Sequence, residues 1–209
     1  MTVTPNIRVF CVDDHPLMQE GIANVISSQP DMVLVAAVSN GTQAIQKFRE
    51  HTPDVTLMDL RLPDMSGIDA MIAIRSEFPE ARVIILSTYS GDVEIGRALE
   101  AGARSYLLKD IPPKEIVEVI RQVHAGKKKL CGDIAAHLAE HFSDEKLTDR
   151  EAEVLQQIAG GNRNRDIADK LFITEETVKK HITHIMEKLG AADRTQAVAI
   201  GVRRGIIHL

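Results

Sequence analysis

Five short apolar runs alternate with amphipathic segments through the first 125 residues of the chain. Several runs are continuously apolar, which is typical of strands that are buried on both faces of a parallel sheet. The runs are Ile7–Val12, Met32–Ala37, Val55–Met58, Arg82–Leu86 and Ser105–Leu108. Helices are expected near residues 16–28, 41–51, 67–78, 92–102 and 113–125. Five strands that are each followed by a helix predict a doubly wound α/β domain with a five-stranded parallel sheet.

The C-terminal part of the chain has helical spacing instead. From Thr148 onward four helices are expected, because residues that favour helix starts precede the amphipathic stretches. These start signals are a capping box of Thr148 and Glu151, N-cap residues at Asn164 and Thr174, and a box-like pair of Asp193 and Gln196. The chain therefore divides into a domain over 1–125, a linker over 126–146 with a short helix near 134–142, and an all-α four-helix domain over 147–209.

The net charge is uneven along the chain. Residues 1–125 carry 11 Lys and Arg against 17 Asp and Glu, a net charge of −6, whereas residues 126–209 carry 14 against 13, a net charge of +1. This asymmetry indicates two modules with different partners. Cys11 and Cys131 lie far apart and have no metal-binding spacing, and no secretory signal or membrane span is visible. We therefore expect a cytoplasmic protein.

Acidic residues follow two of the expected strands. Asp13 and Asp14 come after the first strand, and Asp59 comes after the third. The carboxyl ends of parallel strands meet at one edge of a sheet, so these carboxylates converge if the two strands are neighbours. Three carboxylates repel one another and need a cation, and hard oxygen ligands suit Mg²⁺. With the ammonium of Lys109 and the hydroxyl of Ser87, this edge becomes a site that accepts a phosphoryl group on an aspartate.

These positions resemble the receiver domain of two-component response regulators over residues 5–125. The resemblance rests on Asp13, Asp14, Asp59, Ser87, Tyr106 and Lys109. It implies a flavodoxin-like fold in which Asp59 is the phosphoacceptor and a histidine kinase is the phosphodonor. Asp110 departs from the pattern, because many receivers have proline after the lysine, and this leaves open whether the Lys109–Asp110 peptide bond is cis.

The resemblance also assigns roles to the neighbours of the phosphoacceptor. It implies that the metal ligands are Asp14, Asp59 and the backbone carbonyl of Arg61, with Asp13 acting through water. Ser87 and Tyr106 would form a switch pair, in which the hydroxyl moves toward the phosphate and the ring follows inward. Two further acidic residues are expected to serve as a helix cap or a loop residue only, namely Asp54 and Asp64.

Residues 167–189 have the spacing of a helix-turn-helix. Apolar residues recur on one face of its second helix, which packs inward; they are Val178, Ile182, Ile185, Met186 and Leu189. The other side would enter the major groove of DNA, where Lys reads guanine edges and Thr reads bases or methyl groups. The candidate groove residues are Thr177, Lys179, Lys180, Thr183 and His184. The candidates for phosphate contacts are Arg163, Arg165, Thr174 and Lys188.

The helical domain resembles the LuxR-type helix-turn-helix. The resemblance rests on residues 147–151, Asn164, Ile167, Ala168 and the run Thr177-Val178-Lys179. A receiver joined to this domain is the layout of NarL/FixJ response regulators. It implies a transcription regulator that needs Mg²⁺, dimerises when active, binds paired half-sites in double-stranded promoter DNA and can contact RNA polymerase. In that family the last helix helps to pair two DNA-binding domains, and the candidate contacts here are Ala197, Val198 and Gly201.

Three other functions stay open from the sequence. A phosphatase of the haloacid dehalogenase type also uses an aspartate nucleophile and Mg²⁺, but it requires a DxD pair after the first strand, where this chain has Asp13-Asp14-His15. The other two are a DNA binder whose receiver is not phosphorylated and an interaction protein without DNA affinity. We expect a phosphoacceptor rather than a turnover enzyme. Hydrolysis of a generic phosphate ester and a salt-dependent DNA titration would separate these functions.

Overall fold

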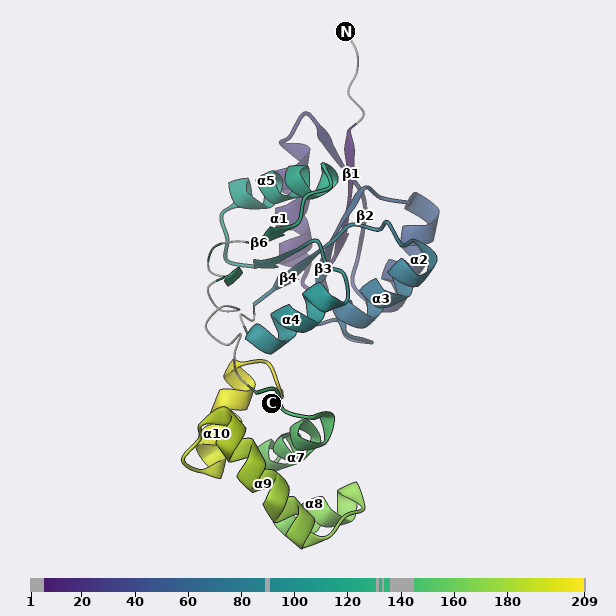
Figure 1. The fold of residues 1–209 in the computed structure, drawn as a ribbon. Helices are drawn as coiled ribbons and strands as arrows, with labels where there is room; N and C mark the ends of the chain where they lie inside the picture. Colours follow the sequence, from purple (N-terminus) through teal and green to yellow (C-terminus); the bar gives the residue numbers. More distant parts are fainter. Residues whose placement is uncertain (1–5, 89–90, 131, 133, 136–144, 209) are drawn as a thin grey trace. The chain divides into compact units, whose positions relative to one another are not determined.

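The chain forms two compact units. One holds residues 1–88 and 96–135, and the other holds residues 89–95 and 136–209. The computed structural model describes residues 6–88, 91–130, 132, 134–135 and 145–208 (Figure 1). No helix within these ranges is long and apolar enough to cross a membrane.

The first unit is built on a parallel sheet with the strand order β2-β1-β3-β4-β5-β6 (Figure 1). Its strands are β1 (Ile7–Val12), β2 (Met32–Val38), β3 (Val55–Asp59), β4 (Val83–Ser87), β5 (Ser105–Leu108) and β6 (Lys129–Leu130). The first five agree with the prediction to within one residue at each end. The doubly wound parallel architecture is therefore confirmed.

The sixth strand corrects the expected count of five. β6 pairs in parallel with β5, with Lys129 opposite Ser105 and Leu130 opposite Tyr106. A strand of two residues beside a run of lysines has no periodicity of its own, so the pattern places it in the linker. Most of the helix expected near 134–142 falls outside the described residues.

Helices cover both faces of the sheet. α1 and α5 lie on one face, and α2 and α3 lie on the other (Figure 1). The helices are α1 (Pro16–Ser27), α2 (Gly41–His51), α3 (Gly67–Glu77), α4 (Asp92–Glu100) and α5 (Pro113–His124). The apolar sides of α1 and α5 pack on buried side chains such as Val9, Leu57 and Ile84. Each such side chain contributes roughly 1.5–3 kcal/mol when it is fully buried.

The strand order puts the ends of β1 and β3 side by side. β1 lies between β2 and β3, so the chain winds outward in both directions from this point, and ligands of open α/β sheets bind in the crevice there. Val12 pairs with Met58, the residue before Asp59. Asp13, which follows Val12, and Asp59 therefore emerge at the same edge of the sheet.

The second unit has the four expected helices in its described part. They are α7 (Asp149–Ala159), α8 (Asn164–Leu171), α9 (Glu175–Leu189) and α10 (Arg194–Arg203). The capping box of Thr148 and Glu151 is confirmed, and Thr174 caps α9 by accepting a hydrogen bond from the Thr177 amide at 3.1 Å. α8 starts one residue earlier than expected. Its N-cap is Arg163, whose amide donates to the Asp166 carboxylate at 3.1 Å.

The close approach of Gly67 to the backbone of Asp59 can be tested by substitution. A Cβ atom at Gly67 would overlap the backbone carbonyl oxygen of Asp59, whereas a Cβ atom at Gly21 in α1 has no neighbour within 4 Å. We expect Gly67→Ala to lower the free energy of unfolding by about 1–3 kcal/mol, because one side has to move. Gly21→Ala is the control and should be neutral or raise it by about 0.5–1 kcal/mol. Urea unfolding measures both, and equal stability of the two variants would contradict the prediction.

Candidate functional site

Three of the predicted site residues meet at the carboxyl edge of the sheet. Asp13 follows β1, Asp59 ends β3 and Lys109 follows β5. The Lys109 Nζ atom lies 2.8 Å from Asp13 Oδ2 and 2.9 Å from Asp59 Oδ2. Both carboxylates are buried, with 0% and 3% of the residue exposed. One ammonium therefore bridges two buried carboxylates.

Backbone hydrogen bonds hold these strand ends in place. The Asp13 amide donates to Val38 O at 3.0 Å, and the Lys109 amide donates to Ser87 O at 2.8 Å. Just after Asp59, the Leu60 amide donates to Leu86 O at 3.1 Å. The charged side chains therefore project from paired backbone, which fixes their distances and limits the reorganisation that a reaction would require.

The charges in this pocket do not balance. Burial raises the pKa of Asp59 above its usual value, although the hydrogen bond and charge of Lys109 act in the opposite direction. For Lys109, burial alone would lower the pKa, but the hydrogen bonds to Asp13 and Asp59 raise it above its usual value. The ammonium thus stays protonated and leaves the pocket with excess negative charge.

The pocket also has the donor atoms for a divalent cation. One ligand atom from each of Asp13, Asp14, His15 and Asp59 can be chosen so that all lie within 4.8 Å of one another. Carboxylate oxygens around an open edge are the ligands that Mg²⁺ takes in phosphoryl-transfer sites. His15 is at the exposed edge of this group, with 69% of its side chain exposed, and its Nδ1 lies 2.7 Å from Asp14 Oδ1.

The other predicted receiver residues lie around this pocket. Ser87 ends β4 and is buried, and Tyr106 lies within β5 with its ring fully buried. Arg61 lies two residues after Asp59 and forms an isolated bridge with Ser66. No peptide bond is cis among the described residues, so the Lys109–Asp110 bond is trans.

Asp54 and Asp64 have structural roles, as expected. The Asp54 carboxylate accepts a hydrogen bond from the Arg8 amide at 2.8 Å in a loop. Asp64 caps α2, because its carboxylate accepts hydrogen bonds from the Gly41 and Thr42 amides and from the Thr42 hydroxyl at 2.6–2.9 Å. These bonds, with that of the Thr42 hydroxyl first, lower the pKa of Asp64 to about 2.

In the second unit α8 and α9 form the expected helix-turn-helix. The turn between them starts at Phe172, which has a left-handed backbone and is 94% exposed. The predicted inner face of α9 is confirmed: Val178, Ile185 and Leu189 are buried, and Ile182 and Met186 pack against the same core. The predicted groove residues lie outside this face. Lys179, Lys180, Thr183 and His184 are exposed and Thr177 is partly exposed.

The predicted phosphate contacts fall into two groups. Arg163, Arg165 and Thr174 are exposed near the start of α8 or α9. Lys188, in contrast, is turned toward α7: its Nζ lies 2.9 Å from Glu151 Oε2, and only 15% of its side chain is exposed. Glu151, which was expected to act in the capping box only, is thus also the partner of Lys188, and no local sequence pattern indicates this ion pair.

Two of the three predicted dimer contacts lie inside the domain. Ala197 is buried in the core of the second unit. A Cβ atom at Gly201 would meet Leu155 and Ile207 at 2.7 and 3.1 Å, so this glycine allows α10 to pack closely on its own domain. Val198 is partly exposed. Of the three, only Val198 is placed where a second copy of the chain could touch it.

The pKa values of Asp59 and Asp64 are shifted in opposite directions, so we expect the two residues to have opposite effects on stability as the pH changes. Because burial raises the pKa of Asp59, its charged form destabilises the folded state at neutral pH. Asp59→Asn should therefore unfold at a higher urea concentration than the wild type near neutral pH, and this gain should shrink as the pH falls toward about 4 and the wild-type carboxyl is protonated.

Asp64→Asn is the matched control with the reverse sign. Because the pKa of Asp64 is lower in the folded state than in the unfolded state, its charged form stabilises the folded state at pH values above the pKa of the unfolded state. This contribution is lost as the pH falls from about 4 toward 2. The control should therefore be less stable than the wild type at neutral pH. A destabilised Asp59→Asn at neutral pH would contradict the charge imbalance described above.

Comparisons with known proteins agree with both units. Residues 9–121 match the family model "Response regulator receiver domain", and residues 145–200 match "Bacterial regulatory proteins, luxR family". The chain is 40% identical to the transcriptional regulatory protein YxjL of Bacillus subtilis, over 97% of this chain and 98% of that protein. It is 38% identical to LiaR, a transcriptional regulatory protein of the same organism, over 97% and 100% of the two chains.

A solved structure shares the layout of the whole chain. The response regulator ChrA, from a heme-sensing two-component system, is 35% identical with a TM-score of 0.58, over 97% of this chain and 99% of that chain. The similarity to full-length relatives therefore spans both units of the chain. The chain belongs to the response regulators that join a receiver domain to a LuxR-type DNA-binding helix-turn-helix domain.

Proposed function

We propose that this transcription regulator is switched by transfer of a phosphoryl group from a histidine kinase to Asp59. The observation that carries the proposal is the buried Asp59 carboxylate, 2.9 Å from Lys109 Nζ and beside the Asp13 carboxylate at the edge of the sheet. A carboxylate nucleophile next to a fixed cation and a cluster of oxygen ligands has the parts that phosphoryl transfer requires.

In the proposed step an Asp59 oxygen attacks the phosphorus atom of a phosphohistidine. The new oxygen–phosphorus bond forms as the phosphorus–nitrogen bond breaks, and the imidazole nitrogen keeps the electron pair and takes up a proton. Lys109 stabilises the charge on the phosphoryl oxygens, and the Ser87 hydroxyl donates to one of them. Mg²⁺ held by Asp14, Asp59 and the carbonyl of Arg61, with Asp13 acting through water, would supply the remaining positive charge.

The product is a phosphorylated protein, so the chain acts as a phosphoacceptor rather than as a turnover enzyme. Support comes from the second unit and from full-length relatives that are named transcriptional regulatory proteins. A phosphatase would instead require a substrate-selective pocket around the nucleophile. Phosphorylation shifts an equilibrium between inactive and active forms, and a change from mostly inactive to mostly active requires about 5.5 kcal/mol.

We further propose that the exposed side of α9 reads the major groove. Lys180 and Thr183 are exposed there, while Arg163 and Arg165 hold phosphates from the start of α8. The Thr183 hydroxyl donates to Lys179 O at 3.2 Å, which leaves its oxygen as an acceptor for a base. Two copies of the domain would bind half-sites about 34 Å apart in promoter DNA.

Acetyl phosphate with Mg²⁺ tests the phosphoacceptor directly. We expect intact-mass spectrometry to show one added phosphoryl group on the wild type and none on Asp59→Asn or after chelation of Mg²⁺. Lys109→Gln should slow the reaction by about 100-fold, because one fixed positive charge is lost from the transition state. Asp54→Asn is the matched control on a partly exposed loop carboxylate and should react like the wild type. Phosphorylation of Asp59→Asn would overturn the assignment.

A further inference from the structure

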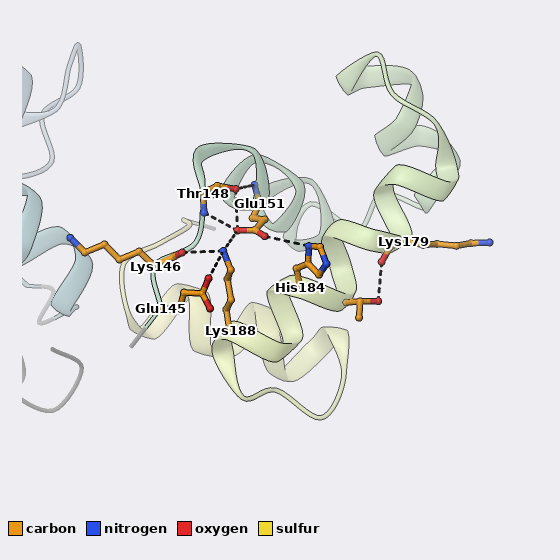
Figure 2. A network of polar contacts seen from close by, with 8 residues as sticks. Glu145, Lys146, Thr148, Glu151, Lys179, His184 and Lys188 are labelled. Carbon is orange, nitrogen blue, oxygen red and sulfur yellow. Dashed lines mark hydrogen bonds and ion pairs between the residues drawn. The ribbon is translucent and has the colours of Figure 1, made fainter. Parts of the chain in front are cut away.

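A buried carboxylate links the first helix of the DNA-binding domain to its recognition helix. Glu151 lies in the first turn of α7 and has 4% of its surface exposed. Its Oε2 atom accepts hydrogen bonds from the Thr148 amide at 2.8 Å, the Thr148 hydroxyl at 3.0 Å and Lys188 Nζ at 2.9 Å (Figure 2). The same carboxylate thus caps α7 and binds the last turn of α9.

The Lys188 ammonium makes three contacts within the domain. An ammonium has three N–H donors. Besides Glu151, the Nζ atom donates to Lys146 O at 3.3 Å and lies 3.5 Å from Glu145 Oε1. Figure 2 shows the Lys188 side chain pointing into this cluster, whereas Lys179, on the same helix, extends away from it. The chain that enters the domain at residues 145–148 is therefore tied to the end of the recognition helix.

The pair resists separation. Burial alone would raise the pKa of Glu151, but the hydrogen bonds from Thr148 and Lys188 hold it below its usual value, so the carboxylate is charged at neutral pH. If Lys188 turned outward to a DNA phosphate, a buried carboxylate would lose its cation, and breaking a buried ion pair is strongly unfavourable. His184 Nδ1 lies 3.9 Å from Glu151 Oε1 on the exposed flank, which is beyond hydrogen-bond distance.

We infer that Lys188 is a positioning residue that, with Glu151, fixes the recognition helix against α7 and the entering chain, and that it does not contact DNA. This assignment replaces the phosphate contact that the sequence suggests for Lys188. The two roles differ in a measurable quantity. Each phosphate contact adds about 0.9 to the slope of the logarithm of the DNA association constant against the logarithm of salt concentration.

The first test measures that slope with the full chain. A short fluorescent duplex of random sequence is titrated at several KCl concentrations, and binding is followed by anisotropy. Lys188→Gln should weaken binding severalfold at every salt concentration with the slope unchanged, because the helix is displaced but no phosphate contact is lost. Arg165→Gln is the matched control, and its slope should fall by about 0.9. A similar fall for Lys188→Gln, or unchanged affinity, would overturn the inference.

A second variant should change the DNA affinity in opposite directions under the two possible roles of Lys188. Glu151→Gln keeps a side chain that can serve the capping box but removes the charge that holds Lys188. If Lys188 positions the helix, Glu151→Gln weakens DNA binding, and the double variant with Lys188→Gln is no weaker than either single variant, because the two residues act as one unit. If Lys188 contacts DNA, its release strengthens binding, and the inference is wrong.

Two controls keep these outcomes separate from other failures. Glu153→Gln removes an exposed carboxylate on the same helix and measures the general effect of one less negative charge on DNA affinity. Circular dichroism establishes that each variant is folded before its affinity is interpreted. A wild-type chain that binds no duplex even at low salt would refute DNA binding itself. Binding with the wrong sign or slope in the variants would refute only the positioning role.

Discussion

At the edge of the receiver sheet, two buried carboxylates share one ammonium, and the chemistry of the first unit depends on this excess of negative charge. The strand order places Asp13 and Asp59 side by side, and Lys109 reaches both from β5. A pocket that is short of positive charge favours a divalent cation, and that cation together with the Lys109 ammonium could then stabilise the negative charge of an incoming phosphoryl group. The charged form of Asp59 thus lowers the stability of the folded state at the site of the proposed phosphoryl transfer.

The helix-turn-helix has a second buried acid–lysine cluster with the opposite character. Glu151 and Lys188 satisfy one another, the hydroxyl and amide of Thr148, and a carbonyl of the entering chain. Since its polar atoms have partners inside the domain, such a cluster favours rigidity over reactivity. The cluster of Asp13, Asp59 and Lys109 can bind a further charged group, whereas the pair of Glu151 and Lys188 holds α9 in place. The same residue types would therefore serve the proposed switch in one unit and a fixed scaffold in the other.

How well the sequence predicts a feature of this structure depends on how far apart along the chain the interacting residues lie. Hydrophobic periodicity and caps are local, so the bounds of the five longer strands and the starts of the four C-terminal helices were correct to within one residue. Parallel strands bring their ends together, so the meeting of Asp59 with Lys109 followed from topology alone. β6 and the inward turn of Lys188 depend on tertiary pairing, which no local pattern records. Gly201 was misplaced because small residues suit both a dimer surface and a close internal contact.

We propose that phosphorylation of Asp59 controls the DNA affinity of the second unit. The most direct measurement is the affinity of the full chain for a duplex selected from a random pool, with and without acetyl phosphate and Mg²⁺, for the wild type beside Asp59→Asn. We expect the phosphodonor to strengthen DNA binding by the wild type and to promote its dimerisation, while the variant does not respond. Equal affinity of the wild type in both conditions, with Asp59 fully phosphorylated, would contradict it.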